Sequence, residues 1–269
     1  MAKLNQPAKF TIFMQQNKWL GQPATAQGVI PSSAGLLKPS AAPNQIDLIR
    51  YNIQNNTGSS AVVALVGFLP DSYWEAGQVN AAGALTLDTT DAQDGDTNDF
   101  ALETTTQNDG HLIGADCKFG AISYDVTTAG VGTSPTHVFE YWNGSAWASV
   151  AAAGMLIDVP RSTDWAVGEQ LVMFATPPDW AKGGSGTGVN ANRYNIRVRR
   201  TNATQTTAAL ARRIYVGLVL DAARGVANNA SLSYNGPSSL EVPYAVGAIF
   251  CAYSAANSGN LMSVSYNFV

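Results

Sequence analysis

Charged side chains are scarce in this chain of 269 residues, because Asp, Glu, Lys and Arg together make up only 13% of it. That share is about half of what an ordinary soluble domain carries. Apolar residues make up 46% of the chain, and the formal net charge is −4. A disordered chain needs the opposite composition, with few apolar residues and a high net charge. The composition therefore excludes general disorder and favours a folded, β-rich chain with a core of its own.

Cysteine and histidine are also rare. Cys117 and Cys251 lie far apart and form no CxxC pair, which excludes a metal ribbon or a thiol redox motif. We interpret both as buried apolar side chains rather than as a disulfide or a reactive thiol. His111 and His137 come without the GxSxG turn or the HExxH helix of hydrolases and zinc enzymes. We therefore expect no enzyme activity and no cofactor.

Long apolar runs are missing as well. The longest uncharged apolar stretch, residues 61–70, is much shorter than the roughly 20 residues of a membrane helix. Residues 1–7 lack the apolar core of a signal peptide. We therefore expect a soluble protein with no membrane partner and no secretory signal. Its sparse charge suggests that other subunits cover much of its surface.

The sequence is rich in short alternating runs bounded by Gly, Pro, Asn and Ser, and it has almost no helical periodicity. From about residue 79, such runs recur every eight to twelve residues or so, which is the spacing of a sandwich or barrel. We predict strands in the first part at residues 10–14, 46–53 and 61–69. In the middle we predict strands at residues 119–127, 137–142, 170–174, 194–200 and 213–220. The last predicted strands are residues 231–234, 242–253 and 261–269.

The predicted fold class is therefore all-β. We expect residues 79–221 to form a jelly-roll-like antiparallel β-sandwich module that is inserted into a second β-rich portion. That second portion consists of residues 1–78 and 222–269, which we expect to pack together. Within the first segment, the Pro-, Gly-, Ser- and Ala-rich residues 22–43 are predicted to form an extended arm.

One segment is more specific than the rest, since residues 139–147 have the sequence Phe-Glu-Tyr-Trp-Asn-Gly-Ser-Ala-Trp. Two aromatic residues, an Asn-Gly turn and a returning Trp predict a compact hairpin. Asn143 and Gly144 would supply the two positive φ angles of a type I′ turn. Further along the chain lie a Thr-Pro-Pro-Asp-Trp turn at 176–180, a Gly-rich spacer, and the strand Arg-Tyr-Asn-Ile-Arg-Val-Arg at 193–199.

Together these segments resemble a β-sandwich module that recurs in structural proteins of tailed-bacteriophage virions. In that module a Tyr-Trp-Asn-Gly-Ser-x-Trp hairpin precedes a Pro-x-x-Trp turn and an aromatic-Ile-Arg-Val strand. The resemblance covers about half of the chain, residues 79–221. One departure is Tyr194-Asn195, where a Trp usually precedes Ile-Arg. Because such modules occur in capsid decoration, neck, baseplate and fibre proteins, the resemblance implies a virion and no single component of it.

The aromatic residues around this hairpin have two interpretations. Trp142, Trp147 and Trp180 are candidate binding residues, because flat rings can stack on sugars. Large aromatic residues in a sandwich more often belong to the core, however, and strand alternation requires Tyr141 or Trp142 to point inward. We therefore prefer core packing, and an exposed pair of parallel rings would favour glycan binding instead.

An acidic segment and a basic segment are the other candidates. Asp91, Asp94, Asp96 and Asp99 are candidate calcium ligands, because calcium takes six to eight oxygens. Their spacing differs from that of an EF-hand loop, so we prefer a solvated acidic loop.

Six of the nine arginines lie between residues 193 and 213. We expect Arg193, Arg197 and Arg199 to share the outward face of one strand. Nucleic acid would need such charge, but the acidic chain and its few lysines argue against that partner. A salt-bridged strand face, or a contact with an acidic subunit, is the preferred interpretation.

We therefore expect a non-enzymatic structural protein of a tailed-phage virion, with a capsid decoration or cement role preferred. The expected partners are the major capsid protein or other virion subunits, together with copies of the chain itself, with a trimer favoured. The expected location is the capsid surface. The alternatives are a neck, baseplate or tail-fibre protein that contacts glycans through its aromatic residues and, in another class, a polysaccharide depolymerase.

Overall fold

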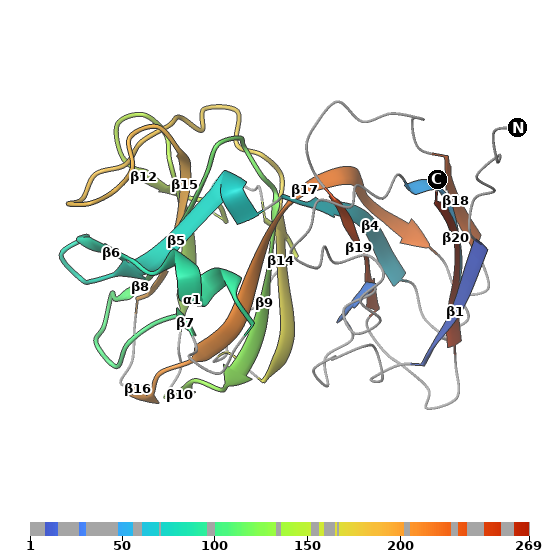
Figure 1. The fold of residues 1–269 in the computed structure, drawn as a ribbon, viewed down its shortest axis with the longest axis horizontal. Coiled ribbons are helices and arrows are strands. Elements are labelled where there is room, and N and C mark those ends of the chain that lie inside the picture. Colours follow the sequence, from blue (N-terminus) through green and yellow to red (C-terminus); the bar gives the residue numbers. More distant parts are fainter. Residues whose placement is uncertain are drawn as a thin grey trace, which may run out of the picture. The chain divides into compact units, whose positions relative to one another are not determined.

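The structure is a computed structural model in which the chain forms two compact units (Figure 1). Unit 1 combines Met1–Pro70 with Val219–Val269, and unit 2 is Asp71–Leu218. The residues that the structure describes are 9–15, 27–30, 48–55, 61–69, 71–95, 100–132, 136–151, 156–158, 165, 167–201, 205–226, 231–235, 245–253 and 261–268. No helix within these ranges is long and apolar enough to cross a membrane.

Strands dominate both units, which confirms the predicted all-β class. The strands expected in the middle of the chain are present as β9 (Ala121–Thr128), β11 (His137–Trp142), β14 (Gly168–Phe174), β15 (Tyr194–Arg200) and β17 (Leu210–Val226). The short helices are η1 (Asp71–Tyr73) and α1 (Thr89–Gln93). Helix α1 lies in the acidic segment, where we had expected a loop.

Unit 2 contains a six-stranded antiparallel sheet in the order β12-β11-β15-β8-β5-β6. Its remaining strands are β12 (Trp147–Ser149), β8 (Gly110–Ala115), β5 (Trp74–Val79) and β6 (Leu85–Leu87). A second sheet runs β13-β14-β9-β17, where β13 is Leu156–Asp158 and β7 (Phe100–Ala101) also pairs with β17. A small pair joins β10 (Val131–Gly132) to β16 (Gln205–Thr207).

The two larger sheets of unit 2 pack against each other as a β-sandwich (Figure 1). Inward residues alternate with outward ones, so Ile196 and Val198 of β15 are buried while Arg197 lies on the opposite face. Across the core, the rings of His111 on β8 and Tyr124 on β9 lie 5.3 Å apart. These contacts support a sandwich, and the jelly-roll subtype stays a prediction.

The boundary of unit 2 differs from the predicted module at its first strand. Strand β5 lies before the predicted start at residue 79. It nevertheless belongs to unit 2, because it pairs with β8 along its whole length, from Trp74↔Ala115 to Val79↔Gly110. This partner is far away in the sequence, so the change of composition near residue 79 did not reveal the boundary.

Unit 1 brings the two ends of the chain together. Its four-stranded sheet has the order β1-β20-β3-β18, with β1 at Lys9–Gln15, β20 at Leu261–Phe268, β3 at Leu48–Asn55 and β18 at Ser231–Asn235. In the other set of strands, β4 (Ala61–Phe68) follows β17, and β19 (Ala245–Tyr253) joins β4 to β2 (Gln27–Ile30).

The predicted arm contains part of this second set of strands. Strand β2 lies within residues 22–43 and pairs with β19, from Ile30↔Ile249 to Gln27↔Ala252. The rest of the predicted arm lies outside the described residues. This part of the arm is therefore a strand of unit 1.

Candidate functional site

The candidate site is the outer face of the six-stranded sheet, where the hairpin of β11 and β12 lies beside β15. The predicted hairpin is confirmed, since Trp142 faces Trp147 across it. The predicted type I′ turn is wrong, because Gly144 has a positive φ of 97° while Asn143 has none. The side chain of Asn143 organises the loop instead. Its Oδ1 accepts hydrogen bonds from the backbone N of Ser145 at 3.0 Å, from Ser145 Oγ at 3.0 Å and from the backbone N of Ala146 at 2.8 Å.

Trp142 and Trp147 are both half-buried and meet edge to face. Their ring centroids lie 5.6 Å apart with an interplanar angle of 67°, so they do not form the parallel pair that glycan stacking would favour. The guanidinium of Arg197 lies over the Trp147 ring at 4.5 Å. Trp147 Nε1 also donates to the backbone O of Ser185 at 3.1 Å. Trp147 therefore contacts both a neighbouring loop and an arginine.

That loop is the Gly-rich segment between Trp180 and β15. A Cβ at Gly184 would lie only 2.8 Å from the Trp147 ring, so a larger residue there would collide with it. From β15, the buried Asn195 amide donates to the backbone O atoms of Gly183, Asn190 and Arg193 in this loop, at 2.8, 3.0 and 3.2 Å. The loop is thus held by Trp147 at one point and by Asn195 at the other.

Trp180 is a core residue and not a surface residue, which corrects its prediction as a binding candidate. Only 3% of it is exposed, and its ring lies 5.0 Å from Phe119 and 5.9 Å from Tyr194. Tyr141 and Trp165 are also buried. Core packing is therefore confirmed for Trp180 and Tyr141. Along β11, Tyr141 points inward and Trp142 is half-buried on the outer face, which agrees with the expectation that one of the two points inward.

Arg197 and Arg199 lie on the outward face of β15, where both pair with Glu140 of β11. Arg199 makes a two-point contact, with Nε at 2.8 Å from Oε2 and a terminal nitrogen at 2.7 Å from Oε1. A terminal nitrogen of Arg197 lies 2.8 Å from Oε2. Burial raises the pKa of the Glu140 carboxyl, but the hydrogen bonds and charges of Arg199 and Arg197 together outweigh burial and leave the pKa below its ordinary value.

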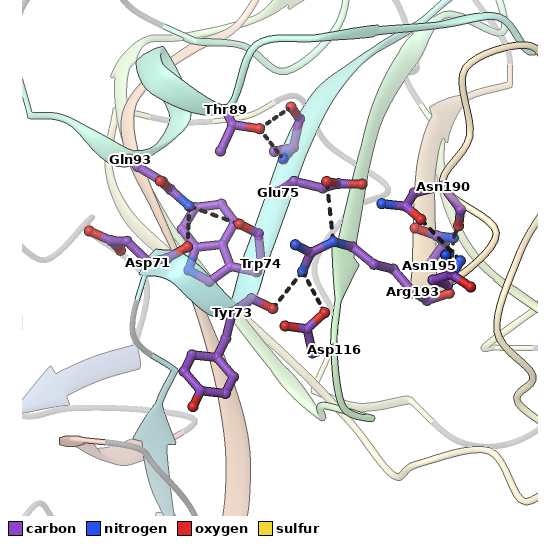
Figure 2. A network of polar contacts seen from close by, with 12 residues as sticks. Asp71, Tyr73, Trp74, Glu75, Thr89, Gln93, Asp116, Asn190, Arg193 and Asn195 are labelled. Carbon is purple, nitrogen blue, oxygen red and sulfur yellow. Dashed lines mark hydrogen bonds and ion pairs between the residues drawn. The ribbon is translucent and has the colours of Figure 1, made fainter.

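Arg193 belongs to a second network, which Figure 2 shows at close range. Its Nε lies 3.1 Å from Glu75, and a terminal nitrogen lies 3.1 Å from Asp116 and 2.8 Å from the backbone O of Tyr73. Nearby, Gln93 Nε2 donates to the backbone O of Asp71 at 2.7 Å and of Trp74 at 2.9 Å. Arg193 thus ties β5 and the end of β8 to the start of β15.

The other arginines of the basic segment also have acidic partners. Arg212 pairs with Asp125 at 2.6 Å and Arg213 with Asp71 at 2.8 Å. Arg200 lies 3.8 Å from Glu103. The preferred interpretation of a salt-bridged strand face is therefore confirmed for Arg197 and Arg199 of β15. Arg193 is ion-paired as well, but it lies just before β15 and not on the strand. Whether these residues also contact another subunit stays a prediction.

The acidic candidates do not come together as a metal site in the part of the chain that the structure describes. Asp91 lies in α1 and Asp94 just after it, whereas Asp96 and Asp99 lie outside the described residues. Among the described residues, no group of three or more His, Cys, Asp or Glu side chains is arranged to hold a metal ion. The backbone O of Asp94 instead accepts a hydrogen bond from Arg213 at 2.9 Å.

A buried polar cluster at one end of the sandwich was not predicted. Glu103 Oε2 lies 2.8 Å from His137 Nε2, and Glu103 Oε1 accepts from Gln205 Nε2. Arg200 is directly opposite His137 in the sheet and completes the cluster. All four residues are at least nine-tenths buried. The available signal was that Arg200 shares the inward positions of β15 with Ile196 and Val198.

The outer face of this sheet thus carries ion-paired arginines beside the aromatic hairpin of β11 and β12. No family model matches the chain, and a search of the curated proteins finds no match. What the site can do chemically follows from its own residues. Among the described residues, its arginines are paired within the chain, with Glu140 for Arg197 and Arg199 and with Glu75 and Asp116 for Arg193.

Proposed function

We propose that the protein is a non-enzymatic structural component of a tailed-phage particle, and that its preferred role is capsid decoration or cement. The observation that carries the proposal is the meeting of the three motif segments that resemble the virion module. The Tyr141 hydroxyl donates to Asp179 at 3.0 Å, the backbone N of Ala181 donates to the O of Trp142 at 2.9 Å, and Trp180 Nε1 donates to the O of Asn195 at 3.2 Å. The residues of the resemblance therefore build one packed body.

A cement protein acts by association, so its binding free energy must come from surface that it covers. Apolar burial supplies about 25 cal/mol per Å², before the cost of ordering both partners is subtracted. Unit 1 suits this role, because it holds only nine of the chain's 34 charged side chains although it has 121 of the 269 residues. We assign unit 1 to the shell-facing contact, with copies of the chain related by closed symmetry, a trimer by preference.

Copy number tests the proposal. Purified particles would be analysed by quantitative mass spectrometry against the major capsid protein, and particles lacking this protein would be heated beside complete ones. Hundreds of copies, with earlier heat-induced genome release when the protein is absent, would support cement. A count of about six or twelve copies would overturn that role in favour of a neck, baseplate or fibre protein. Such a count is what a single ring of subunits would give.

The same particles test which unit makes the contact. Replacing surface residues of unit 2, for example Arg212→Gln, should leave particle binding unchanged because Arg212 already pairs with Asp125 within its own chain. Loss of particle binding in this variant, with unit 2 still folded, would contradict the assignment of the contact to unit 1. Binding would be measured by co-sedimentation of the full chain with depleted particles.

A further inference from the structure

We propose that Asn143 and Gly144 form a self-modifying site, in which the hairpin turn promotes loss of the Asn143 side-chain amide and its conversion to aspartate or isoaspartate. The inference does not depend on the proposed function. It rests on three features of the turn: the hydrogen bonds to Asn143 Oδ1, the freedom of the Gly144 amide, and the freedom of the Asn143 side-chain nitrogen.

The first feature is the set of donors on Asn143 Oδ1. Two backbone N–H groups, of Ser145 and Ala146, and the Ser145 hydroxyl all donate to this one oxygen, at 3.0, 2.8 and 3.0 Å. When a nucleophile attacks Cγ, negative charge develops on Oδ1. Hydrogen bonds to an ionised acceptor are about twice as strong as those to a neutral one, so these donors stabilise the attacked state more than the resting amide. The arrangement is that of an oxyanion hole.

The second feature is the nucleophile, which is the backbone nitrogen of Gly144. Gly144 is exposed, and its N–H donates to no residue that the structure describes. Solvent base can therefore remove its proton. The residue has no side chain to hinder the approach, and the nearest atom to a Cβ built there is the Cβ of Ala181 at 3.5 Å. The third feature is the leaving group, which is the Asn143 side-chain nitrogen. Asn143 Nδ2 donates to no described residue, so no hydrogen bond to the described residues keeps it from leaving as ammonia.

The chemical step balances with water alone. The Gly144 nitrogen gives its proton to solvent base and bonds to Asn143 Cγ, while the carbonyl electron pair moves to Oδ1. The pair returns as the bond from Cγ to Nδ2 breaks, and the departing nitrogen takes a proton from water and leaves as ammonia. Water then opens the five-membered imide at either carbonyl, which gives aspartate or isoaspartate. One water is consumed, one ammonia is released, and nothing is oxidised or reduced.

Isoaspartate would alter the hairpin that carries the aromatic pair. It places one additional methylene in the main chain between β11 and β12, where Asn143 N now donates to the O of Ala146 at 3.1 Å. The register that sets Trp142 opposite Trp147 depends on this closure. We therefore expect the Trp pair and the stacked Arg197 to loosen as the site converts. The fraction of chains with a loosened hairpin on this face of unit 2 should therefore increase slowly as the protein ages.

Peptide mapping by mass spectrometry tests the proposal on the full chain, incubated for weeks in mildly alkaline buffer, with isoaspartate located by enzymatic methylation. Conversion at Asn143 should be at least roughly threefold faster in the folded chain than in the same chain in urea. The gain is expected to be well below the ~10²–10³ of an enzyme's oxyanion donor, because these donors already bind the neutral amide. Equal or slower conversion in the folded chain would show that the turn protects Asn143, and would overturn the proposal.

Ser145→Ala removes one donor and leaves the two backbone donors in place. It should slow conversion at Asn143 by several-fold in the folded chain and leave it unchanged in urea. The second Asn-Gly pair of the chain, Asn235 and Gly236, is the internal reference, and its rate should not respond to the substitution. An unchanged rate at Asn143 in a variant with native Trp fluorescence would count against the oxyanion role. If the variant does not fold, the comparison of the folded and urea-treated wild type decides the proposal.

Discussion

His111 is completely buried between the sheets of unit 2, where its imidazole has two fixed partners. Nδ1 lies 2.7 Å from the backbone O of Leu102, which can only accept, so Nδ1 carries the proton and donates. Nε2 then accepts from the Tyr124 hydroxyl at 3.0 Å. Burial lowers the pKa of His111 from 6.5 to about 4 and outweighs the opposing bond to Leu102. The folded state therefore requires a neutral His111.

Acid should destabilise unit 2 through this residue. Because the folded pKa lies below the unfolded pKa, the stabilisation is present above about pH 6.5 and is lost as pH falls toward about 4. Between about pH 7 and pH 4.5 the free energy of unfolding should fall by about 2 kcal/mol from His111 alone. Urea unfolding followed by Trp fluorescence would measure it. His111→Gln, which cannot titrate, is the control, and an equal acid response in this variant would contradict the prediction.

The buried polar cluster around Glu103 and the turn at Asn143 are two features that the sequence did not predict correctly. Ion pairing of Arg197 was predictable, because alternation along the strand places this arginine outward, where a partly exposed charge is usually paired. The burial of Glu103 was not, since its partners His137 and Arg200 are brought to it only by the packing of separate strands. The turn was wrong for a local reason, because the Asn143 side chain took the hydrogen bonds that the type I′ prediction gave to the main chain.

At the scale of elements, strands were predictable where their alternation is local. Strands β11 and β15 begin and end at the predicted residues, because each has buried apolar residues at alternate positions, Phe139 and Tyr141 in β11 and Ile196 and Val198 in β15. The Gly-rich spacer gave no such signal. Its ordered path depends on Trp147 and on the Asn195 amide, and both lie outside the spacer.

Gly186 tests that path. Its φ is +137°, and a Cβ there would lie 2.1 Å from the backbone O of Gly83, so Gly186→Ala should both strain the main chain and push the loop away from its neighbour. We expect a loss of about 2 kcal/mol or more in thermal unfolding, with a change in Trp emission because Trp147 contacts this loop.

Gly95→Ala is the matched control for that substitution. No atom of the described residues lies within 4 Å of a Cβ built at Gly95, and its φ is not in the positive range, so the cost should stay within about 0.5 kcal/mol. Similar costs for the two variants would mean that the spacer is not held in the described path.

At the scale of the whole molecule, the chain passes between the units at Pro70–Asp71 and at Leu218–Val219. Residues near both crossing points are joined by side-chain contacts within unit 2. Asp71 pairs with Arg213 of β17 at 2.8 Å, although 142 positions separate the two residues. Gln93 also holds the backbone O of Asp71 at 2.7 Å. The composition of the chain predicted a module in this region. The Asp71–Arg213 ion pair was not predictable, because its two residues come from opposite ends of the unit and meet only in the fold.

Unit 2 should therefore fold without unit 1. Its sandwich core, from Trp74 to Val216, is contributed by its own strands, and the Asp71–Arg213 pair joins its two ends. Residues 71–218 expressed alone should unfold in one cooperative transition and show the Trp emission of buried rings, because Trp74, Trp165 and Trp180 are all buried within this unit. Asp71→Asn in the excised unit should lower its stability by about 1 kcal/mol, since the ion pair is partly exposed. An excised unit that aggregates or melts gradually would mean that unit 1 supplies part of its core.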